Sequence, residues 1–261
     1  MRKIVFIALG SLVLFAGFGL ALLKTAHGFA AAGYVWAKLR GGYTVEERLQ
    51  MHGPKVAEIL RPKFQRANVP YPPAALAYVA FKSESKMEVY ARSFSQEPWV
   101  LIHTYPILGL SGNLGPKLRE GDLQVPEGIY RAEFLNANSR FHLSIRLNYP
   151  NEFDQKKGEE DGRNNLGSDI MIHGTNSSIG CLAIGNQAAE ELFILAAKSG
   201  KENVHIIVSP VDFRRVDYEP DRDQPNWVTD LYWELSQKLS QFPLPATPYP
   251  PKQESSPVAS D

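Results

Sequence analysis

Cysteine is almost absent from this chain of 261 residues, since Cys181 is the only one. No disulfide within the chain and no metal site with two cysteine ligands can therefore form. An excess of charge of either sign is also lacking, because 28 Lys and Arg residues balance 28 Asp and Glu residues without long runs. This balance disfavours a nucleic-acid partner, and we expect neither a cofactor nor a metal ion. Internal repeats are absent too, so one globular domain is the default expectation.

Long hydrophobic runs are confined to the N-terminus. After Arg2 and Lys3, residues 4–23 carry no charge, and about 20 apolar residues suffice for one membrane span. The run is longer than the apolar core of a signal peptide, so we expect an uncleaved membrane anchor in residues 1–24 rather than a cleaved leader. The basic N-terminus predicts that the rest of the chain lies in the periplasm, anchored to the inner membrane. If the segment is cleaved instead, the protein is secreted.

The regions at either end of the central part are expected to be linkers. Gly53-Pro54 and Pro62 interrupt a charged segment with spaced apolar residues, which predicts short helices in a stalk covering residues 25–74. His52 lies in this stalk and is expected to be solvated. At the other end, residues 243–261 are rich in Pro and Ser and are expected to form a disordered tail.

Residues 75–210 predict a mostly β domain with flanking helices. Short runs rich in Val, Ile, Tyr and Phe are separated by Gly, Pro, Asn and Asp, which is typical of strands and turns. His103 and His205 are assigned to the core or its edge. The expected strands cover residues 76–81, 87–92, 99–105, 128–134, 140–147, 169–173 and 204–209. In the fifth of these, alternation predicts that Phe141, Leu143 and Ile145 face the core, opposite to His142, Ser144 and Arg146.

Two helices are expected in the second half of the chain. The first follows Cys181, with Asn186 as its N-cap and Gly200 just beyond its C-terminus. The second covers about residues 229–242 in a C-terminal extension, residues 211–242, and its apolar face could pack against the β domain.

The stretch from Ile172 to Leu182 places the only cysteine in a glycine turn between a strand end and a helix start. A thiol becomes an effective nucleophile as a thiolate, and a neighbouring imidazole is the usual means of removing its proton. His173 is placed to do so, and the N–H groups of Gly180 and Cys181 could stabilise an oxyanion. Each feature is weak alone, but their combination in an exported chain indicates covalent catalysis.

The same stretch carries a family resemblance. His173-Gly174 followed by Ser178-Ile179-Gly180-Cys181 resembles the signature of the L,D-transpeptidase catalytic domain family, also called YkuD domains. That signature is His-Gly, a variable spacer, then Ser or Thr, any residue, Gly and Cys. The short spacer and the block from Ser111 to Gly128 are similar to the YafK-like branch in particular. The resemblance covers about residues 75–210.

The resemblance implies a fold, a location and a reaction. It implies a β-sandwich or barrel-like domain in the periplasm that acts on peptidoglycan stem peptides containing diaminopimelate. It makes Cys181 the nucleophile and His173 the base, with the Gly174 carbonyl orienting the imidazole and with Ser178 and Gly180 in the cysteine turn. For the YafK-like branch, the implied reaction is hydrolysis of the link between peptidoglycan and its covalently attached outer-membrane lipoprotein.

Substrate contacts are less clearly indicated. Many transpeptidases have His at the position of Ile179 and Asn or Arg at the position of Ala183, so substrate handling is expected to differ here. Charged residues of one loop could recognise the zwitterionic end of diaminopimelate or simply form a charged surface: Lys117, Arg119, Glu120 and Asp122. His142 and Arg146 could line the cleft or belong to a solvated sheet face.

Two alternatives to the hydrolase stay open. One is a transpeptidase that cross-links peptidoglycan or attaches the lipoprotein, if an amine acceptor outcompetes water. The other is a non-catalytic, membrane-tethered module that binds the cell wall, in which Cys181 is merely buried.

Overall fold

The computed structural model describes residues 41–245. The expected anchor in residues 1–24 and nearly all of the expected tail lie outside the described residues. Among residues 41–245, no helix is both long enough and apolar enough to cross a membrane. The description below concerns the compact unit that begins at Val45.

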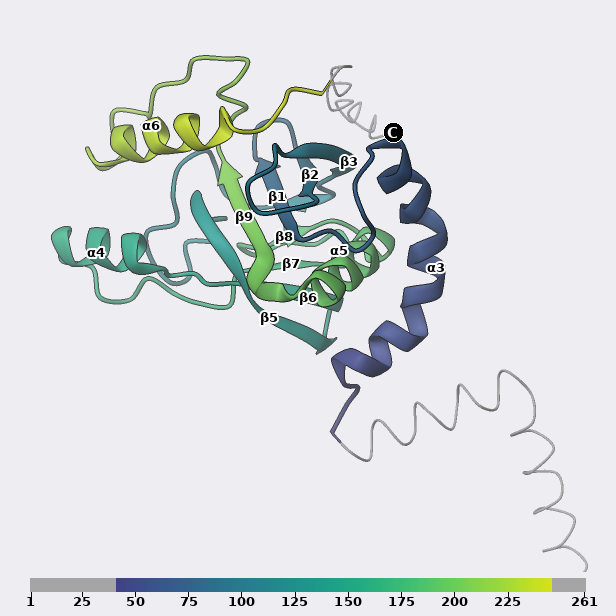
Figure 1. Cartoon of the computed structure of the whole chain (residues 1–261). Coiled ribbons are helices and arrows are strands. Elements are labelled where there is room, and N and C mark those ends of the chain that lie inside the picture. Colours follow the sequence, from purple (N-terminus) through teal and green to yellow (C-terminus); the bar gives the residue numbers. More distant parts are fainter. Residues whose placement is uncertain (1–40, 246–261) are drawn as a thin grey trace, which may run out of the picture. The chain divides into compact units, whose positions relative to one another are not determined.

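The strands within residues 41–245 form one nine-stranded sheet in the order β3-β2-β1-β9-β5-β6-β7-β8-β4 (Figure 1). Neighbouring strands are antiparallel, except for the parallel pairs β1 with β9 and β7 with β8. The expected fold class, mostly β with flanking helices, is confirmed. The strands are β1 (Ala75–Phe81), β2 (Lys86–Arg92), β3 (Val100–Pro106), β4 (Gly109–Leu110), β5 (Gly128–Ser139), β6 (His142–Leu147), β7 (Met171–His173), β8 (Leu182–Ala183) and β9 (Val204–Ser209).

Strand β1 is buried on both faces, which explains why its sequence reads as a continuous apolar run. Val79 and Phe81 belong to the hydrophobic core that includes Leu235 of α6 (Val228–Leu239). The Tyr78 hydroxyl, on the opposite face of the strand, donates to the Leu192 carbonyl of α5 (Asn186–Ser199) at 2.8 Å. The centre of the sheet is thus covered by one helix on each side.

Strand β5 connects the two parts of the sheet. Its first residues, from Gly128 to Arg131, pair with β9, whereas those from Ala132 onward pair with β6. The register shifts between Ala132 and Phe134, and irregularities of this kind bend a strand and increase its twist. The sheet therefore curves here.

Helix α3 (Val45–Arg66) is a single helix, although Pro54 and Pro62 lie inside it. The expectation of short helices broken at these prolines is wrong. Val56, Leu60 and Phe64 are at most 1% exposed, and burial of this apolar stripe outweighs the cost of the prolines. From Val45 onward, the expected stalk is instead part of the compact unit.

Two details of the helices also differ from expectation. The N-cap of α5 is Gly185 rather than Asn186, whose side-chain oxygen accepts a hydrogen bond from the Thr175 N–H at 2.9 Å. Helix α4 (Glu152–Glu160) was not expected, because it has almost no apolar stripe. It begins instead with a capping box formed by Asn151 and Asp154.

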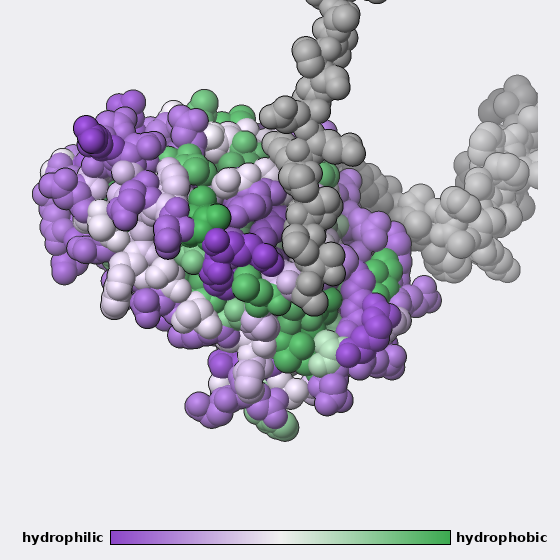
Figure 2. Space-filling model, turned by 90° about the horizontal axis from the view of Figure 1, so that it is seen from above, coloured by the Kyte–Doolittle hydropathy of each residue, from purple (hydrophilic) through white to green (hydrophobic). Residues whose placement is uncertain are grey.

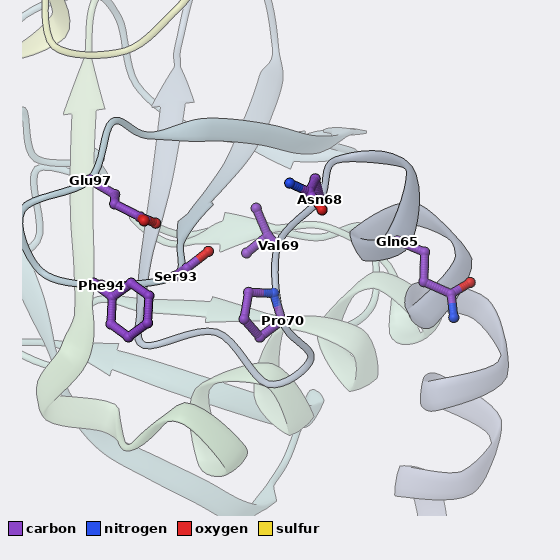
Figure 3. Close-up of a pocket in the computed structure, with 7 residues that line it drawn as sticks. All are labelled: Gln65, Asn68, Val69, Pro70, Ser93, Phe94 and Glu97. Carbon is purple, nitrogen blue, oxygen red and sulfur yellow. The ribbon is translucent and has the colours of Figure 1, made fainter.

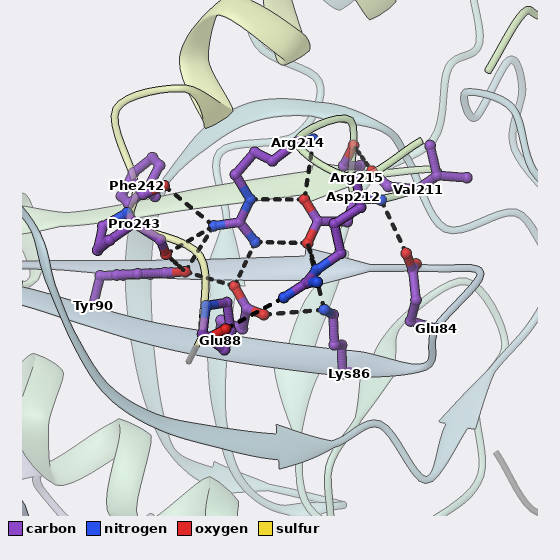
Figure 4. A network of polar contacts seen from close by, with 12 residues as sticks. Glu84, Lys86, Glu88, Tyr90, Val211, Asp212, Arg214, Arg215, Phe242 and Pro243 are labelled. Carbon is purple, nitrogen blue, oxygen red and sulfur yellow. Dashed lines mark hydrogen bonds and ion pairs between the residues drawn. The ribbon is translucent and has the colours of Figure 1, made fainter. Parts of the chain in front are cut away.

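A buried polar network attaches the C-terminal end of the described chain to the sheet (Figure 4). The Arg214 guanidinium donates to Asp212 at 2.7 and 2.8 Å and to Glu88 of β2 at 2.7 Å. It also donates to the carbonyls of Phe242 and Pro243, which follow α6, at 3.4 and 3.3 Å. The two carboxylate side chains are completely buried. Seen from above, the molecular surface is hydrophilic over a wide area, and many of the hydrophobic residues in that view lie toward its middle (Figure 2).

Candidate active site

The parallel strands β7 and β8 bring the two halves of the motif together. Ile172 pairs with Leu182, and His173 pairs with Ala183. Cys181 directly precedes β8, and its Sγ lies 3.7 Å from the carbonyl oxygen of Asp169, just before β7. The thiol and the imidazole therefore belong to adjacent strands, although eight positions separate them in the sequence.

The ring of His173 is fixed from two sides. Its Nδ1 lies 2.6 Å from the Gly174 carbonyl oxygen, and the Phe141 ring stacks on it with centroids 4.7 Å apart. Because a carbonyl only accepts, Nδ1 must carry the proton, which leaves Nε2 of the neutral ring as a base. Burial lowers the pKa of His173, and the hydrogen bond to Gly174 opposes this only in part. The neutral form thus prevails at pH 7.

Glycine is required after this histidine. A Cβ added to Gly174 would lie 2.5 Å from the Asn186 Oδ1 and 2.7 Å from the Phe141 carbonyl oxygen. Both distances are shorter than a Cβ atom tolerates. Because Asn186 of α5 and Phe141, just before β6, pack so closely here, only glycine fits as the second residue of the His-Gly pair.

Two serine hydroxyls hold the cysteine turn. Ser178 Oγ accepts from the Cys181 N–H at 3.1 Å and donates to the Cys181 carbonyl at 2.6 Å. Ser111 Oγ accepts from the Gly180 N–H at 2.6 Å. The two N–H groups expected to stabilise an oxyanion are therefore already hydrogen-bonded, and an oxyanion would have to replace these hydroxyls. Gly180 has a φ of 97°, a conformation that favours glycine.

The Cys181 side chain is partly exposed. Burial nevertheless raises the pKa of this thiol; the Asp169 charge raises it further, while the Met171 N–H and the Lys117 charge lower it. The resting thiol is thus protonated near pH 7. The sequence predicted instead that the imidazole maintains a thiolate. If this sulfur acts as a nucleophile, its proton has to leave during the attack, and the free Nε2 of His173 is chemically suited to accept it.

A buried ion pair positions the loop that contains Ser111. Lys82 Nζ donates to the carbonyls of Gly115 at 2.8 Å and Val125 at 3.0 Å, and it lies 2.9 Å from Glu127 Oε1. Both charged side chains are fully buried. The resemblance partly depended on the block from Ser111 to Gly128. This block is a loop attached to Lys82, directly after β1, and it places the Ser111 hydroxyl against the Gly180 N–H of the cysteine turn.

The charged residues of this loop divide into two kinds. Lys117 is 7% exposed, and its Nζ donates to Asp122 at 2.6 Å and to the Arg119 carbonyl at 2.8 Å. Asp122 in turn accepts from three backbone N–H groups of the loop. This pair stabilises the loop and presents no free charge. Arg119 and Glu120 are exposed and stay candidates for substrate contact.

The two candidates on β6 lie in different surroundings. Arg146 is 3.2 Å from Asp169 Oδ1 and 2.9 Å from Glu133 Oε2, and Asp169 contacts the thiol through its carbonyl. Arg146 therefore lies near the cysteine. His142 lies instead beside Gly174, where its Nε2 is 2.7 Å from Glu190 Oε1.

The alternation expected in β6 is partly wrong. Leu143 and Ile145 are buried as expected, but Phe141 is 43% exposed and Ser144 is only 1% exposed. Phe141 precedes the strand and covers His173 rather than the core. Its role, like that of Ser111, was missed in the sequence. The only signal for Ser111 was its place in the block that resembles the YafK-like branch.

Ile179 and Ala183 stand where the sequence comparison expected polar residues, and they differ from each other in exposure. Ile179 is 75% exposed beside the cysteine turn, whereas Ala183 is completely buried.

A separate surface pocket, between the end of α3 and the loop after β2, contains none of the candidate residues (Figure 3). It is lined by Gln65, Asn68, Val69, Pro70, Ser93, Phe94 and Glu97.

Comparisons with known proteins agree with the motif. Residues 82–208 match the family model "L,D-transpeptidase catalytic domain", YkuD. Residues 82–208 are thus similar to that family, as the motif indicated.

Among the curated proteins, the chain is 34% identical over 167 residues to "Putative L,D-transpeptidase YafK" of Escherichia coli strain K12. The match covers 62% of this chain and 64% of that protein, so slightly less than two thirds of the relative's length is represented.

Among solved structures, the helical cell shape determining protein Pgp2 from Campylobacter jejuni is 17% identical, with a TM-score of 0.41, over 64% of this chain and 70% of that one. Bd1075 from Bdellovibrio bacteriovorus is 21% identical, with a TM-score of 0.39, over 66% of this chain and 56% of that one.

Proposed function

We propose that this protein is a cysteine-dependent enzyme that hydrolyses the amide link between peptidoglycan and a covalently attached lipoprotein, at a peptide containing diaminopimelate. Similarity to the L,D-transpeptidase catalytic domain family supports a peptidoglycan-modifying activity. The observation that carries the covalent mechanism is the partly exposed Cys181, held in a hydrogen-bonded turn directly before β8. The neighbouring strand β7 ends at His173, whose Nδ1 proton is fixed by the Gly174 carbonyl.

The reaction is acyl transfer in two steps. Cys181 Sγ attacks the amide carbonyl attached to the L-centre of diaminopimelate, while its proton passes to His173 Nε2. His173 then protonates the leaving amine, and a thioester forms as the amide C–N bond breaks. In the second step, water attacks the thioester with His173 as base, and the carboxylate product and the free thiol are released.

Hydrolysis is favoured over exchange by the surroundings of the thiol. Only three residues separate Gly174 from Ser178, so this segment is too short to form a lid that would shield a thioester from water. Ile179 projects into solvent beside the turn and offers no hydrogen bond to an incoming amine. A transpeptidase is the second candidate, and the similarity to the Escherichia coli protein named as an L,D-transpeptidase favours it.

A competition experiment separates the two candidates. Purified protein is given wall fragments bearing the lipoprotein peptide, together with a large excess of an acceptor containing diaminopimelate or a D-amino acid, and products are followed by mass. Free lipoprotein and trimmed muropeptides are expected to dominate. Dominant exchange products would replace the hydrolase with the transpeptidase.

A non-catalytic wall-binding module is distinguished by the Cys181→Ala variant. We expect this variant to retain its fold, because the side chain is partly exposed, and to lose all turnover. Full turnover in Cys181→Ala would contradict the covalent mechanism. If the parent protein shows no turnover on any wall substrate, the non-catalytic binding module is favoured instead.

The location is proposed from the N-terminal sequence. We place the enzyme in the periplasm, attached to the inner membrane by residues 4–23. Fractionation and N-terminal sequencing of the mature protein test this, since a processed start near Ala30 would indicate a secreted form.

A further inference from the structure

Two histidines and a glutamate from three elements meet beside the cysteine site. His52 lies on α3, His142 begins β6 and Glu190 lies on α5. Within residues 41–245, this is the one group of three or more His, Cys, Asp and Glu side chains placed to share a metal ion. Each offers one ligand atom, and the three atoms lie within 4.8 Å of one another.

The distances fit a small cation. Glu190 Oε1 lies 3.4 Å from His52 Nδ1 and 2.7 Å from His142 Nε2. In a tetrahedral zinc site with bonds of about 2.0–2.1 Å, two ligand atoms stand about 3.3 Å apart. The first separation already has this value, and the second needs to open by about half an ångström. The two rings meet edge to face, 5.7 Å between centroids.

Burial and charge also suit a cation. The side chains of His52, His142 and Glu190 are 16%, 27% and 13% exposed, so the expectation that His52 is solvated is wrong. Burial lowers the pKa of His52, and the Glu190 charge opposes that effect. The positive charge of Arg48 counts against a cation, but its effect on His52 is smaller than that of Glu190.

An irregularity of the backbone lies in the same cluster. His142 has a φ of 77°, in the left-handed region that residues other than glycine rarely adopt. Such a conformation is kept where the surroundings fix a side chain in one place, and it is frequent at functional sites.

We propose that His52, His142 and Glu190 form a binding site for a divalent transition-metal ion, with Zn²⁺ as the best match. Two imidazoles and one carboxylate are a ligand set that Zn²⁺ commonly takes, and they leave one coordination position for water. The ion would tie α3 to α5 and β6. Because an added Cβ on Gly174 would lie 3.0 Å from His142 Cβ, it would also brace the segment that follows His173. This inference is independent of the proposed hydrolase function.

Metal binding is tested with the full-length protein carrying Cys181→Ser, so that no thiol competes for the ion. After treatment with a chelator, Zn²⁺ is titrated by calorimetry, and Co²⁺ is added separately so that its visible absorption reports the coordination geometry. We expect one Zn²⁺ per chain, a rise in Tm on binding, and a Co²⁺ spectrum of four- or five-coordinate type.

Three cluster variants and two histidine controls assign the site. Glu190→Gln, His52→Gln and His142→Asn, each in the Cys181→Ser background, should weaken Zn²⁺ binding by at least about tenfold. Asn is used at residue 142 because it tolerates the left-handed backbone. His103→Gln and His205→Gln, on β3 and β9, should bind Zn²⁺ like the parent.

The result has two clear readings. Weakened binding confined to the three cluster variants supports the site. No Zn²⁺ binding by the Cys181→Ser protein, or equal affinity in cluster and control variants, overturns it. The Tm measured in the presence of chelator shows whether each variant is folded. If a histidine variant does not fold, Glu190→Gln, which keeps the size of the side chain, is the variant that tests the site.

Discussion

At the scale of single residues, the resting thiol and imidazole are both neutral. Burial raises the pKa of Cys181 above its ordinary 9.0 and lowers that of His173 below its ordinary 6.5. A preformed thiolate–imidazolium pair, as in many cysteine enzymes, would require the opposite shifts. For the proposed covalent mechanism, these directions predict that proton transfer to His173 is coupled to the attack of the sulfur on the substrate.

The first prediction concerns His173→Ala. It should lower kcat/KM by on the order of 10²- to 10⁴-fold, because a positioned general base is lost. Alkylation of the free thiol should continue to rise with pH beyond 9.0 in both parent and variant, since His173 does not set the thiol pKa. In the parent, the acidic limb of kcat/KM should lie below pH 6.5. An alkylation rate that levels off near neutral pH in the parent alone would indicate a preformed pair.

The second prediction is that Phe141→Ala lowers kcat with little change in stability. Phe141 is 43% exposed and stacks on the catalytic ring, so its removal frees the imidazole without opening a core cavity. A loss on the order of tenfold is expected from poorer orientation. Phe94→Ala, at a residue that is 68% exposed in the loop after β2, is the matched control. Equal kcat in both variants would remove the positioning role.

The candidate nucleophile and base could be identified in the sequence, but the residues that hold them in place could not. Cys181 and His173 stand out because a lone cysteine follows a glycine, eight positions after a His-Gly pair. Ser111 contacts Gly180 across 69 positions of the chain, and no local pattern reports such a contact. Phe141 was assigned to the core because alternation cannot distinguish a core aromatic residue from one that covers an active site.

At the scale of elements, the buried ion pair between Lys82 and Glu127 links β1 to the loop that begins at Ser111. The third prediction is that Lys82→Met destabilises the fold by about 3–5 kcal/mol, because Glu127 is left buried without its counter-ion. Activity should fall beyond what the folded fraction explains, since the loop also places Ser111. Urea unfolding and turnover per folded molecule measure the two effects.

The control for this prediction is the double variant Lys82→Met with Glu127→Gln. It removes both charges and should recover part of the lost stability. Recovery of stability without recovery of activity is the expected pattern, because the hydrogen bonds of Lys82 to Gly115 and Val125 are still missing. A single variant as stable as the parent would contradict the prediction.

The strands were easier to predict than the short or polar elements. β9 agrees with its expected bounds, because four of its six residues are the β-branched apolar residues Val204, Ile206, Ile207 and Val208. Strands β4 and β8 have two residues each and are defined by pairing with distant segments, β4 with β8 and β8 also with β7. Helix α3 continues through two prolines because its buried apolar stripe stabilises it. No local sequence pattern reports that packing, so the single helix was not predicted.

At the scale of the whole molecule, Arg214 joins three distant segments: β2 through Glu88, the turn after β9 through Asp212, and the end of α6 through the Phe242 carbonyl. Burial alone would raise the pKa of Asp212, but the hydrogen bonds and charge of Arg214 hold it below its ordinary 3.8. The stability that this carboxylate contributes is therefore present above pH 3.8 and is lost as the pH falls through its lower folded pKa.

The last prediction is that Arg214→Met lowers the free energy of unfolding by about 3–5 kcal/mol, since the two fully buried carboxylates then have only Lys86 as a buried counter-ion. The matched control is Arg215→Met. Its side chain is 33% exposed and lies 3.4 Å from Asp212, so it should cost less than about 1 kcal/mol. Urea unfolding at several pH values is the measurement. The gap between parent and Arg214→Met should be widest above pH 3.8 and should narrow below it, because protonation of Asp212 then removes the advantage of the arginine. Equal losses in the two variants, or a gap that does not change with pH, would show that the network does not hold α6 against the sheet.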